Sequence, residues 1–168
     1  SYCLLMKKKL KSKSIIIFCF FFTYFTIFGQ GLMEEKVNTT RQDTLRGSIT
    51  EERSWWDLTY YHLDIKVLPE KKFISGSNTV GYKVLENKKL MQIDLQQPMF
   101  ITSVTSKGKK LKFYRDGNAY FIKMNKRQKV GEVNYIKINY QGNPKEAIRA
   151  PWDGGLSWDK DQNGNHFI

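Results

Sequence analysis

From Trp55 onward the chain alternates between apolar and polar residues. In residues 60–68, "YYHLDIKVL", apolar side chains occupy every second position. A period of two places successive side chains on opposite faces of a β-strand, so this segment predicts a strand with one buried and one solvated face. The residues expected on the buried face are Tyr61, Leu63, Ile65 and Val67.

Turn residues separate this strand from further apolar segments. Residues 69–72 begin with a proline and are expected to turn the chain, and Asp116-Gly117 is typical of a two-residue hairpin loop. Gly76 and Gly81 inside the second segment predict a bulge or a close approach of the backbone. The further strands are expected at residues 73–84, 91–95, 100–104, 111–114, 118–124 and 133–140.

The spacing of these segments decides the fold class. No stretch shows a helical period of 3.6 over eleven or more residues. Seven short strands separated by turns are typical of an antiparallel β-sandwich or curved sheet. The 168 residues suffice for one domain with a core, but hardly for two. We therefore predict an all-β fold.

A basic run and an apolar run open the chain. Five lysines lie between residues 7 and 13, just after Met6, and residues 15–28 follow without a charge. This order is typical of a secretory signal peptide, with Gly29-Gln30-Gly31 as the cleavage site. We expect residues 1–31 to be a signal peptide with upstream residues before a start at Met6. The protein is then exported to the periplasm, the cell surface or the extracellular space.

An uncleaved membrane anchor is the alternative for this segment. Fourteen helical residues reach about 21 Å, which is short of a hydrocarbon core of about 30 Å. The length favours cleavage, and a membrane is expected as a partner only through an uncleaved signal. Residues 32–50 are polar and aperiodic and predict a linker, so that the domain begins at residue 51.

Removal of the signal changes the charge and the cysteine count. The formal net charge of the chain is +12, and 23 basic against 16 acidic residues, or +7, remain in the exported part. Cys3 and Cys19 both lie in the removed segment. The exported part therefore has no cysteine for a disulfide or for a zinc thiolate.

Lysines and aromatic residues are interleaved in the second half of the chain. A surface that binds single-stranded nucleic acid would need this combination. The lysines, however, fall in turns and on the solvated faces of strands, where lysine also protects sheet edges, and export argues against such a partner. We expect no nucleic acid to bind. The residues concerned are Lys107, Lys109, Lys110, Lys112, Lys123, Lys126 and Lys129, with Phe113, Tyr114, Tyr120 and Phe121.

The chain lacks the motifs that would make it an enzyme by itself. His62 and His166 are 104 positions apart, so no H-E-x-x-H zinc motif exists. No G-x-S-x-G elbow and no glycine-rich phosphate loop occur. We expect no catalytic and no metal-binding residue in this chain.

The last ten residues contain a pattern of acidic and amide side chains. Asp159, Asp161, Asn163 and Gly164 fit positions 1, 3, 5 and 6 of a calcium loop. The glutamate of position 12 would fall at residue 170, and no amphipathic helix precedes the loop. A polar hairpin with Asn-Gly at its tip explains the pattern with fewer assumptions.

Several segments together resemble a known family. Their order and spacing are similar to those of the N-terminal domain of aminopeptidase-N-like (gluzincin) zinc metallopeptidases, and more narrowly of the exported bacterial members. The resemblance covers about Asp43 to Ile168. The segments are "DTLRGSITEERSWWDLTYYHLDIKVLPE", "FISGSNTVGYKV", "MQIDLQ", "VGEVNYIKINYQGNP" and "APWDGGLSW".

The resemblance implies a role as part of a larger protein. Residues 51–168 would be a saddle-shaped, non-catalytic β-domain, incomplete at its C-terminus, that packs against its own C-terminal catalytic domain. That parent would be a zinc aminopeptidase acting on the N-terminus of peptides. Its zinc site and catalytic residues would lie beyond residue 168, so zinc is expected in the full-length parent only and none in this chain.

The resemblance also implies a position for one loop. It brings "WDGGLSW" near the substrate cleft, and the substrate-adjacent residues would be Trp152, Asp153, Gly154, Gly155 and Trp158. Packing of the two tryptophans in the core or at an interface is the alternative.

A freestanding exported β-sandwich that binds glycans or protein partners is the other hypothesis for function. It predicts no large exposed apolar face. The aminopeptidase hypothesis predicts such a face, where the catalytic domain docks.

Overall fold

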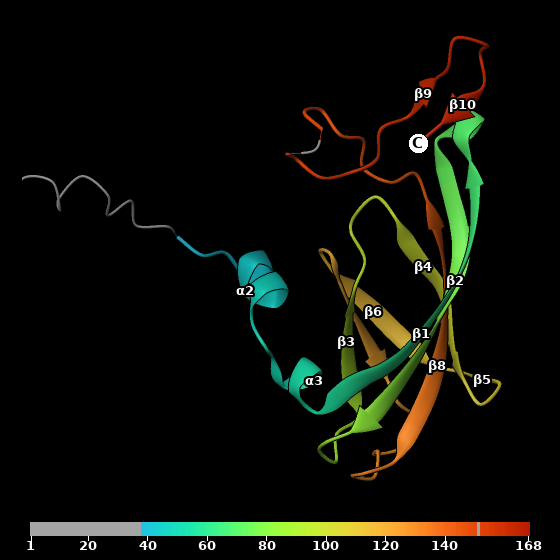
Figure 1. Ribbon diagram of the computed structural model, residues 1–168. Helices are drawn as coiled ribbons and strands as arrows, with labels where there is room; N and C mark the ends of the chain where they lie inside the picture. Colours follow the sequence, from blue (N-terminus) through green and yellow to red (C-terminus); the bar gives the residue numbers. More distant parts are fainter. Residues whose placement is uncertain (1–37, 151) are drawn as a thin grey trace, which may run out of the picture. The chain divides into compact units, whose positions relative to one another are not determined.

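The computed structural model describes residues 38–150 and 152–168 (Figure 1). The predicted signal peptide and the first part of the predicted linker lie outside these residues. No helix within the described ranges is long and apolar enough to cross a membrane. The residues from Thr40 to Ile168 form one unit, which is described below.

Ten strands and three short helical segments make up this unit, and the prediction of an all-β antiparallel fold is confirmed. Each of the seven expected strands is present, with ends shifted by a few residues. The helical segments are α2 (Arg41–Gly47), α3 (Glu51–Ser54) and η1 (Pro69–Lys71). The strands are β1 (Trp56–Leu68), β2 (Phe73–Val84), β3 (Leu90–Asp94), β4 (Phe100–Ser106), β5 (Lys109–Lys110), β6 (Lys112–Asp116), β7 (Ala119–Lys123), β8 (Val133–Gly142), β9 (Asp159–Lys160) and β10 (His166–Phe167).

The strands form two larger sheets and one small hairpin. The large sheet has the order β1-β2-β8-β4-β5, and the small sheet has the order β3-β7-β6. All neighbouring strands in them are antiparallel. The turn at η1 and the Gly117-Asn118 loop join the expected pairs β1–β2 and β6–β7. β9 and β10 form the separate hairpin.

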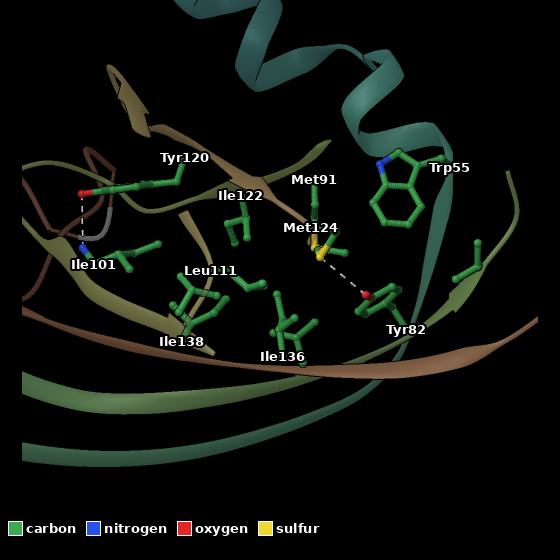
Figure 2. Close-up of a cluster of buried hydrophobic side chains, with 13 residues drawn as sticks. Trp55, Tyr82, Met91, Ile101, Leu111, Tyr120, Ile122, Met124, Ile136 and Ile138 are labelled. Carbon is green, nitrogen blue, oxygen red and sulfur yellow. Dashed lines mark hydrogen bonds between the residues drawn. The ribbon is translucent and has the colours of Figure 1, made fainter. Parts of the chain in front are cut away.

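The core lies between the large and the small sheet (Figure 2). Val80, Ile136 and Ile138 come from the large sheet, Met91 and Ile122 from the small one, and all are at most 3% exposed. A hydrogen bond from the backbone N–H of Ile101 in β4 to the Tyr120 hydroxyl in β7 (3.2 Å) links the two sheets. The two sheets are therefore held together mainly by apolar burial, with few polar contacts across the core.

Trp55 closes one end of this core. Its side chain is fully buried, its Nε1–H donates to the carbonyl of Leu90 (2.6 Å), and its ring meets that of Tyr82 edge to face at 5.8 Å. The indole thus connects the segment before β1 to the edge of the small sheet. A buried tryptophan stabilises the core through the apolar area that it buries, and the hydrogen bond of its N–H fixes the orientation of the ring.

The helix α2 was not expected from the sequence, which predicts only a polar linker in residues 32–50. A capping box starts it, since the Thr40 hydroxyl accepts from the Asp43 N–H and the Asp43 carboxylate accepts from the Thr40 N–H. Leu45 is buried against Ala119 and Phe121 on the small sheet. One apolar residue within a polar segment is too weak a pattern to predict a helix of seven residues.

The two glycines inside β2 mark close contacts, as the sequence predicts. A Cβ at Gly76 would lie 2.1 Å from the carbonyl oxygen of Asp64 on β1. A Cβ at Gly81 would lie 2.6 Å from the Tyr135 ring and 2.9 Å from the Cβ of Tyr60. The rings of Tyr60 and Tyr135 meet over Gly81 at 6.2 Å, and β1 has an irregular register between Leu58 and Tyr60.

Replacement of Gly76 by alanine is therefore expected to destabilise the domain. The added methyl group overlaps a backbone carbonyl, which can move away only if the β1–β2 pairing is distorted, so the free energy of unfolding should fall by about 1–3 kcal/mol. The control is Gly47→Ala, because a Cβ there meets nothing within 4 Å and the loss of backbone freedom in the unfolded chain is mildly stabilising. Urea unfolding of both variants tests this expectation. Equal shifts of the two unfolding midpoints would contradict it.

Tyr82 should make the domain sensitive to alkaline pH. Burial raises the pKa of this phenol to about 12, and the carboxylate of Glu132 adds to the rise. Between about pH 10 and pH 12 the unfolded chain loses a proton that the folded chain keeps, so stability is fully present below pH 10 and falls as the pH rises through this window. Urea midpoints at several alkaline pH values should fall less steeply for Tyr82→Phe; an equal fall would contradict the assignment.

Candidate functional site

The inner face of the large sheet continues beyond the small sheet that covers it. Residues paired between neighbouring strands share a face, and Tyr61 on β1 pairs with Val80, which is a fully buried core residue. Leu63 and Ile65 follow on the same face of β1, opposite Asn78 and Gly76. The register therefore places these β1 side chains on the core side of the sheet.

These side chains are nevertheless exposed. Tyr61, Leu63 and Ile65 have exposed fractions of 51%, 56% and 50%, and Leu58 on the same strand has 43%. The prediction that residues 61, 63, 65 and 67 form a buried face is therefore wrong for the first three, and Val67 is only half-buried. The reason lies in the tertiary structure, because the described core between the two sheets reaches Val80 and does not extend along β1 to these residues.

This uncovered apolar face extends across the sheet to β2 and β8. Ile74 and Tyr140 lie half-buried there, and Gly76 pairs with both Ile65 and Tyr140. Burial raises the pKa of the Tyr61 phenol and of the Tyr140 phenol, and the Asp64 carboxylate adds to the rise at Tyr140. Both phenols stay neutral at physiological pH, so the face gains no charge from them. We call Leu58, Tyr61, Leu63, Ile65, Ile74 and Tyr140 the apolar face.

Asn78 is an exception within this apolar surface. It pairs with Leu63 on one side and Ile138 on the other, between the apolar face and the core. Its side-chain oxygen is buried and accepts no hydrogen bond from the described residues. Leaving a buried acceptor unpaired costs stability, so such an atom needs an explanation.

The loop after β8 is attached to the end of the sheet that bears the apolar face. Asn143 Nδ2 donates to the carbonyls of Lys71 and Lys72 (3.0 Å each), at the turn between β1 and β2. The Lys72 ammonium pairs with the Glu146 carboxylate at 2.6 Å. In Figure 1 the segment after β8 and the small sheet lie on the same side of β2.

Asp153 organises this loop. Its carboxylate accepts the backbone N–H of Ile148 (2.6 Å) and that of Arg149 (3.0 Å), and its carbonyl accepts from the Lys145 ammonium (2.9 Å). These contacts lower the pKa of the Asp153 carboxyl, the Ile148 N–H most of all. Gly155 has φ +107°, and a Cβ there would lie 2.5 Å from the Lys145 carbonyl. The loop therefore needs both residues for its shape.

The two tryptophans of the loop have different surroundings. Trp152 is 88% exposed, and Ile148 in the same loop is 86% exposed. Trp158 is half-buried, and its Nε1 has no hydrogen-bond partner among the described residues. Core packing thus does not account for Trp152. That Trp152, Asp153, Gly154, Gly155 and Trp158 lie beside a substrate stays a prediction.

Replacement of Asp153 by alanine should loosen this loop while the sandwich stays folded. The N–H groups of Ile148 and Arg149 would lose their acceptor, so their hydrogen exchange should accelerate at least several-fold. Exchange at Val80 and Ile136 in the core should not change. Equal exchange at Ile148 in both proteins would contradict this role. Lowering the pH through the depressed pKa of Asp153 should have the same local effect, since the contacts are present above that pKa and lost below it.

The end of the chain forms a polar hairpin, as predicted. β9 pairs with β10, and Gly164 adopts φ +83° at the tip. The Asp161 carboxylate accepts from the N–H groups of Asn163 and Asn165 (2.8 Å each), and the Asn165 side chain contributes most to lowering the pKa of Asp161. These contacts give Asp161 a structural role in the turn.

No group of three or more His, Cys, Asp or Glu side chains within residues 38–150 and 152–168 is arranged to hold a metal ion. His62 lies exposed in β1 and His166 lies in β10. A zinc site in a longer parent protein stays a prediction.

The aminopeptidase hypothesis predicts an exposed apolar face, but the sequence pattern does not show which residues form it. Its residues follow the same alternation as a strand with one buried side, and the pattern contains no sign of whether another layer covers that side. Tyr60 and Tyr135, on the opposite face, were also unassigned, although the glycine between them hints at a close contact.

Comparison with solved structures finds proteins of similar fold, whereas comparison with family models and curated proteins finds no match. An M1 zinc metallopeptidase variant from Deinococcus radiodurans matches 56% of this chain and 22% of its own, with 18% identity and a TM-score of 0.51. A two-domain M1 zinc metallopeptidase variant bound to L-arginine matches 65% and 25%, with 18% identity and a TM-score of 0.53. This chain has a fold similar to part of these metallopeptidases.

A eukaryotic structure gives the same result. Yeast LTA4 hydrolase in complex with bestatin matches 67% of this chain and 18% of its own, with 20% identity and a TM-score of 0.51. This chain thus spans between a fifth and a quarter of the length of the first metallopeptidases. The likeness is one of fold, and it agrees with the family that the sequence resembles.

Proposed function

We propose that this chain is the N-terminal, non-catalytic domain of an exported zinc aminopeptidase. Its apolar face docks the catalytic domain, and the loop that bears Trp152 borders the peptide cleft. The observation that carries the proposal is the apolar face itself, which continues the core side of the large sheet and is left exposed by residues 38–150 and 152–168. The fold likeness to M1 zinc metallopeptidases supports the choice of partner.

The grouping of apolar side chains on this face supports an interface with another domain and argues against exposure by chance. Single exposed apolar residues are normal, but a contiguous group on one sheet face is typical of an interaction site. Leu58, Tyr61, Leu63 and Ile65 are each at least 43% exposed on one strand.

The loop around Trp152 extends the same end of the domain. Hydrogen bonds to Asp153 fix the backbone of the loop, so this backbone has little entropy to lose on contact. In the proposed parent this loop contributes a wall of the cleft, and the chemistry belongs to the zinc-bearing domain. This chain alone, supplied with zinc and an aminoacyl chromogenic substrate, should show no turnover.

A freestanding binding module is the second candidate. The exposure of Trp152 favours it, because exposed aromatic rings are common in sites for sugars and peptides. It leaves the apolar face without a role, which is why we rank it second.

A labelling experiment in two forms of the protein tests the proposal. The gene is first read beyond the codon for Ile168 for an open frame that encodes H-E-x-x-H. Leu63→Cys is then placed in this chain and in the longer protein, with Cys3 and Cys19 replaced by serine, and maleimide labelling rates are compared. Docking should slow labelling at residue 63 at least about tenfold in the longer protein.

Val130→Cys is the matched control, since Val130 is 63% exposed and lies in the segment between β7 and β8, outside the apolar face. Its labelling rate should be the same in both forms. Equal labelling at residue 63 in both forms, or a stop codon directly after residue 168, would refute the domain assignment and leave the binding module.

A further inference from the structure

A hollow of about 420 Å³ lies at the end of the sandwich that carries the β4–β5 turn, whereas Leu63 and Ile65 of the apolar face lie further along the large sheet. It is formed by the β4–β5 turn and by the segment between β7 and β8. In Figure 1, β5 lies at the lower end of the large sheet, whereas the β9–β10 hairpin lies at the upper end. The volume falls within the range of pockets for small molecules.

The floor of the hollow is buried and its rim is exposed. Leu111, Met124, Gln128 and Asn134 line it with exposed fractions of at most 9%. The exposed lining residues include three lysines and one glutamate, which give the lining a formal charge of +2: Lys107, Lys109, Lys126 and Glu132.

The hollow lies in a strongly basic part of the chain. Residues 106–131 contain nine lysines and arginines and one acidic residue, Asp116, which pairs with Arg41. None of the rim lysines forms an ion pair with any residue that the structure describes. Positive charge at a concave surface raises the local concentration of anions.

Hydrogen bonds fix the polar side chains of the floor. The Gln128 Oε1 accepts from the hydroxyl of buried Tyr82 and from Asn134 Nδ2, both at 3.1 Å. Gln128 Nε2 donates to the carbonyl of Lys126 (3.0 Å), so the network reaches the rim. The amides are thus held in one orientation before any ligand arrives, which lowers the entropic cost of binding.

We propose that this hollow binds a small, multiply charged oxyanion such as a phosphate monoester or a polycarboxylate. Lys107 and Lys109 supply charge from the β4–β5 turn and Lys126 from the segment between β7 and β8, and the amides of Gln128 and Asn134 form a polar floor. Lysine ammonium groups bind such anions as point charges with strong, charge-assisted hydrogen bonds. The site does not depend on the docking proposed for the apolar face.

Calorimetric titration of the 168-residue chain with inorganic phosphate and with citrate, at low ionic strength, tests the proposal. The triple variant Lys107→Gln, Lys109→Gln, Lys126→Gln should bind at least about tenfold more weakly. A control triple removes the same charge from exposed lysines near the other end: Lys66→Gln, Lys71→Gln, Lys160→Gln. Its affinity should stay within about twofold of the unmodified chain, and thermal melting should show that both triples are folded.

The outcomes distinguish a specific anion-binding site from a general attraction of anions to the basic surface. Saturable binding lost only in the first triple supports the proposal, and the stronger of the two probes identifies the phosphate or the carboxylate source. No saturable binding of either probe, or an equal loss in both triples, overturns it. Tight binding of an oligothymidylate that phosphate does not displace also overturns it, in favour of a nucleic-acid surface.

Discussion

Replacement of Trp55 by alanine is expected to cost about 3–5 kcal/mol of the free energy of unfolding. The indole is fully buried, touches Tyr82 edge to face, and donates to the Leu90 carbonyl at the end of the small sheet. The substitution leaves a cavity between the sheets and an unpaired carbonyl. Domains are stable by only about 5–15 kcal/mol. The urea concentration at the unfolding midpoint should therefore fall strongly, or cooperative unfolding should be lost.

Trp152→Ala is the matched control for this substitution. Its ring is 88% exposed and has no core contacts, so the free energy of unfolding should change by less than about 0.5 kcal/mol. Equal effects of the two substitutions would show that Trp55 does not support the core as described.

Replacement of Leu63 and Ile65 together by serine is expected to remove the two most exposed aliphatic side chains of β1. Both side chains are at least half exposed, so the free energy of unfolding should change by no more than about 1 kcal/mol. The fluorescence of the dye ANS, which reports exposed apolar surface, should fall roughly threefold in the native protein. Self-association at high concentration should decrease in parallel.

The control removes two apolar side chains from separate places on the surface. Ile49 and Val130 are 83% and 63% exposed, and their replacement by serine should leave the dye fluorescence nearly unchanged. If the two double variants bind the dye equally, β1 bears no contiguous apolar surface, and the basis for the proposed docking disappears.

Local sequence patterns predicted the strands and several turns correctly. The hairpin near Asp116 and the turn at Pro69 follow from residues whose backbone preferences are strong without help from the rest of the fold. The close contacts at Gly76 and Gly81 were also foreseeable, because glycine inside a strand indicates a near neighbour. Which residue provides that neighbour was not, since it depends on the register.

What the sequence could not reveal depends on how the layers cover one another. Leu63 and Val80 occupy the same face of the same sheet, yet one is half exposed and the other is fully buried. Conversely, Gln92 appears as a solvated residue between Met91 and Ile93, but it is 1% exposed and donates to the Leu45 carbonyl at the end of α2. The alternation of apolar and polar residues along β3 does not show that a short helix, itself not predicted, buries this polar residue.

The strand order of the large sheet has a consequence for how the chain is made. β8 lies between β2 and β4 but is the last of the three to be synthesised. Until residues 133–142 leave the ribosome, β2 and β4 each present an open edge, and most contacts that join the sheet connect distant parts of the chain. Such long-range pairing is slow, and open edges invite wrong partners in the meantime. The nascent protein thus lacks the strand that completes its largest sheet until residue 142 has been synthesised, and in this period a chaperone that shields strand edges would help it most.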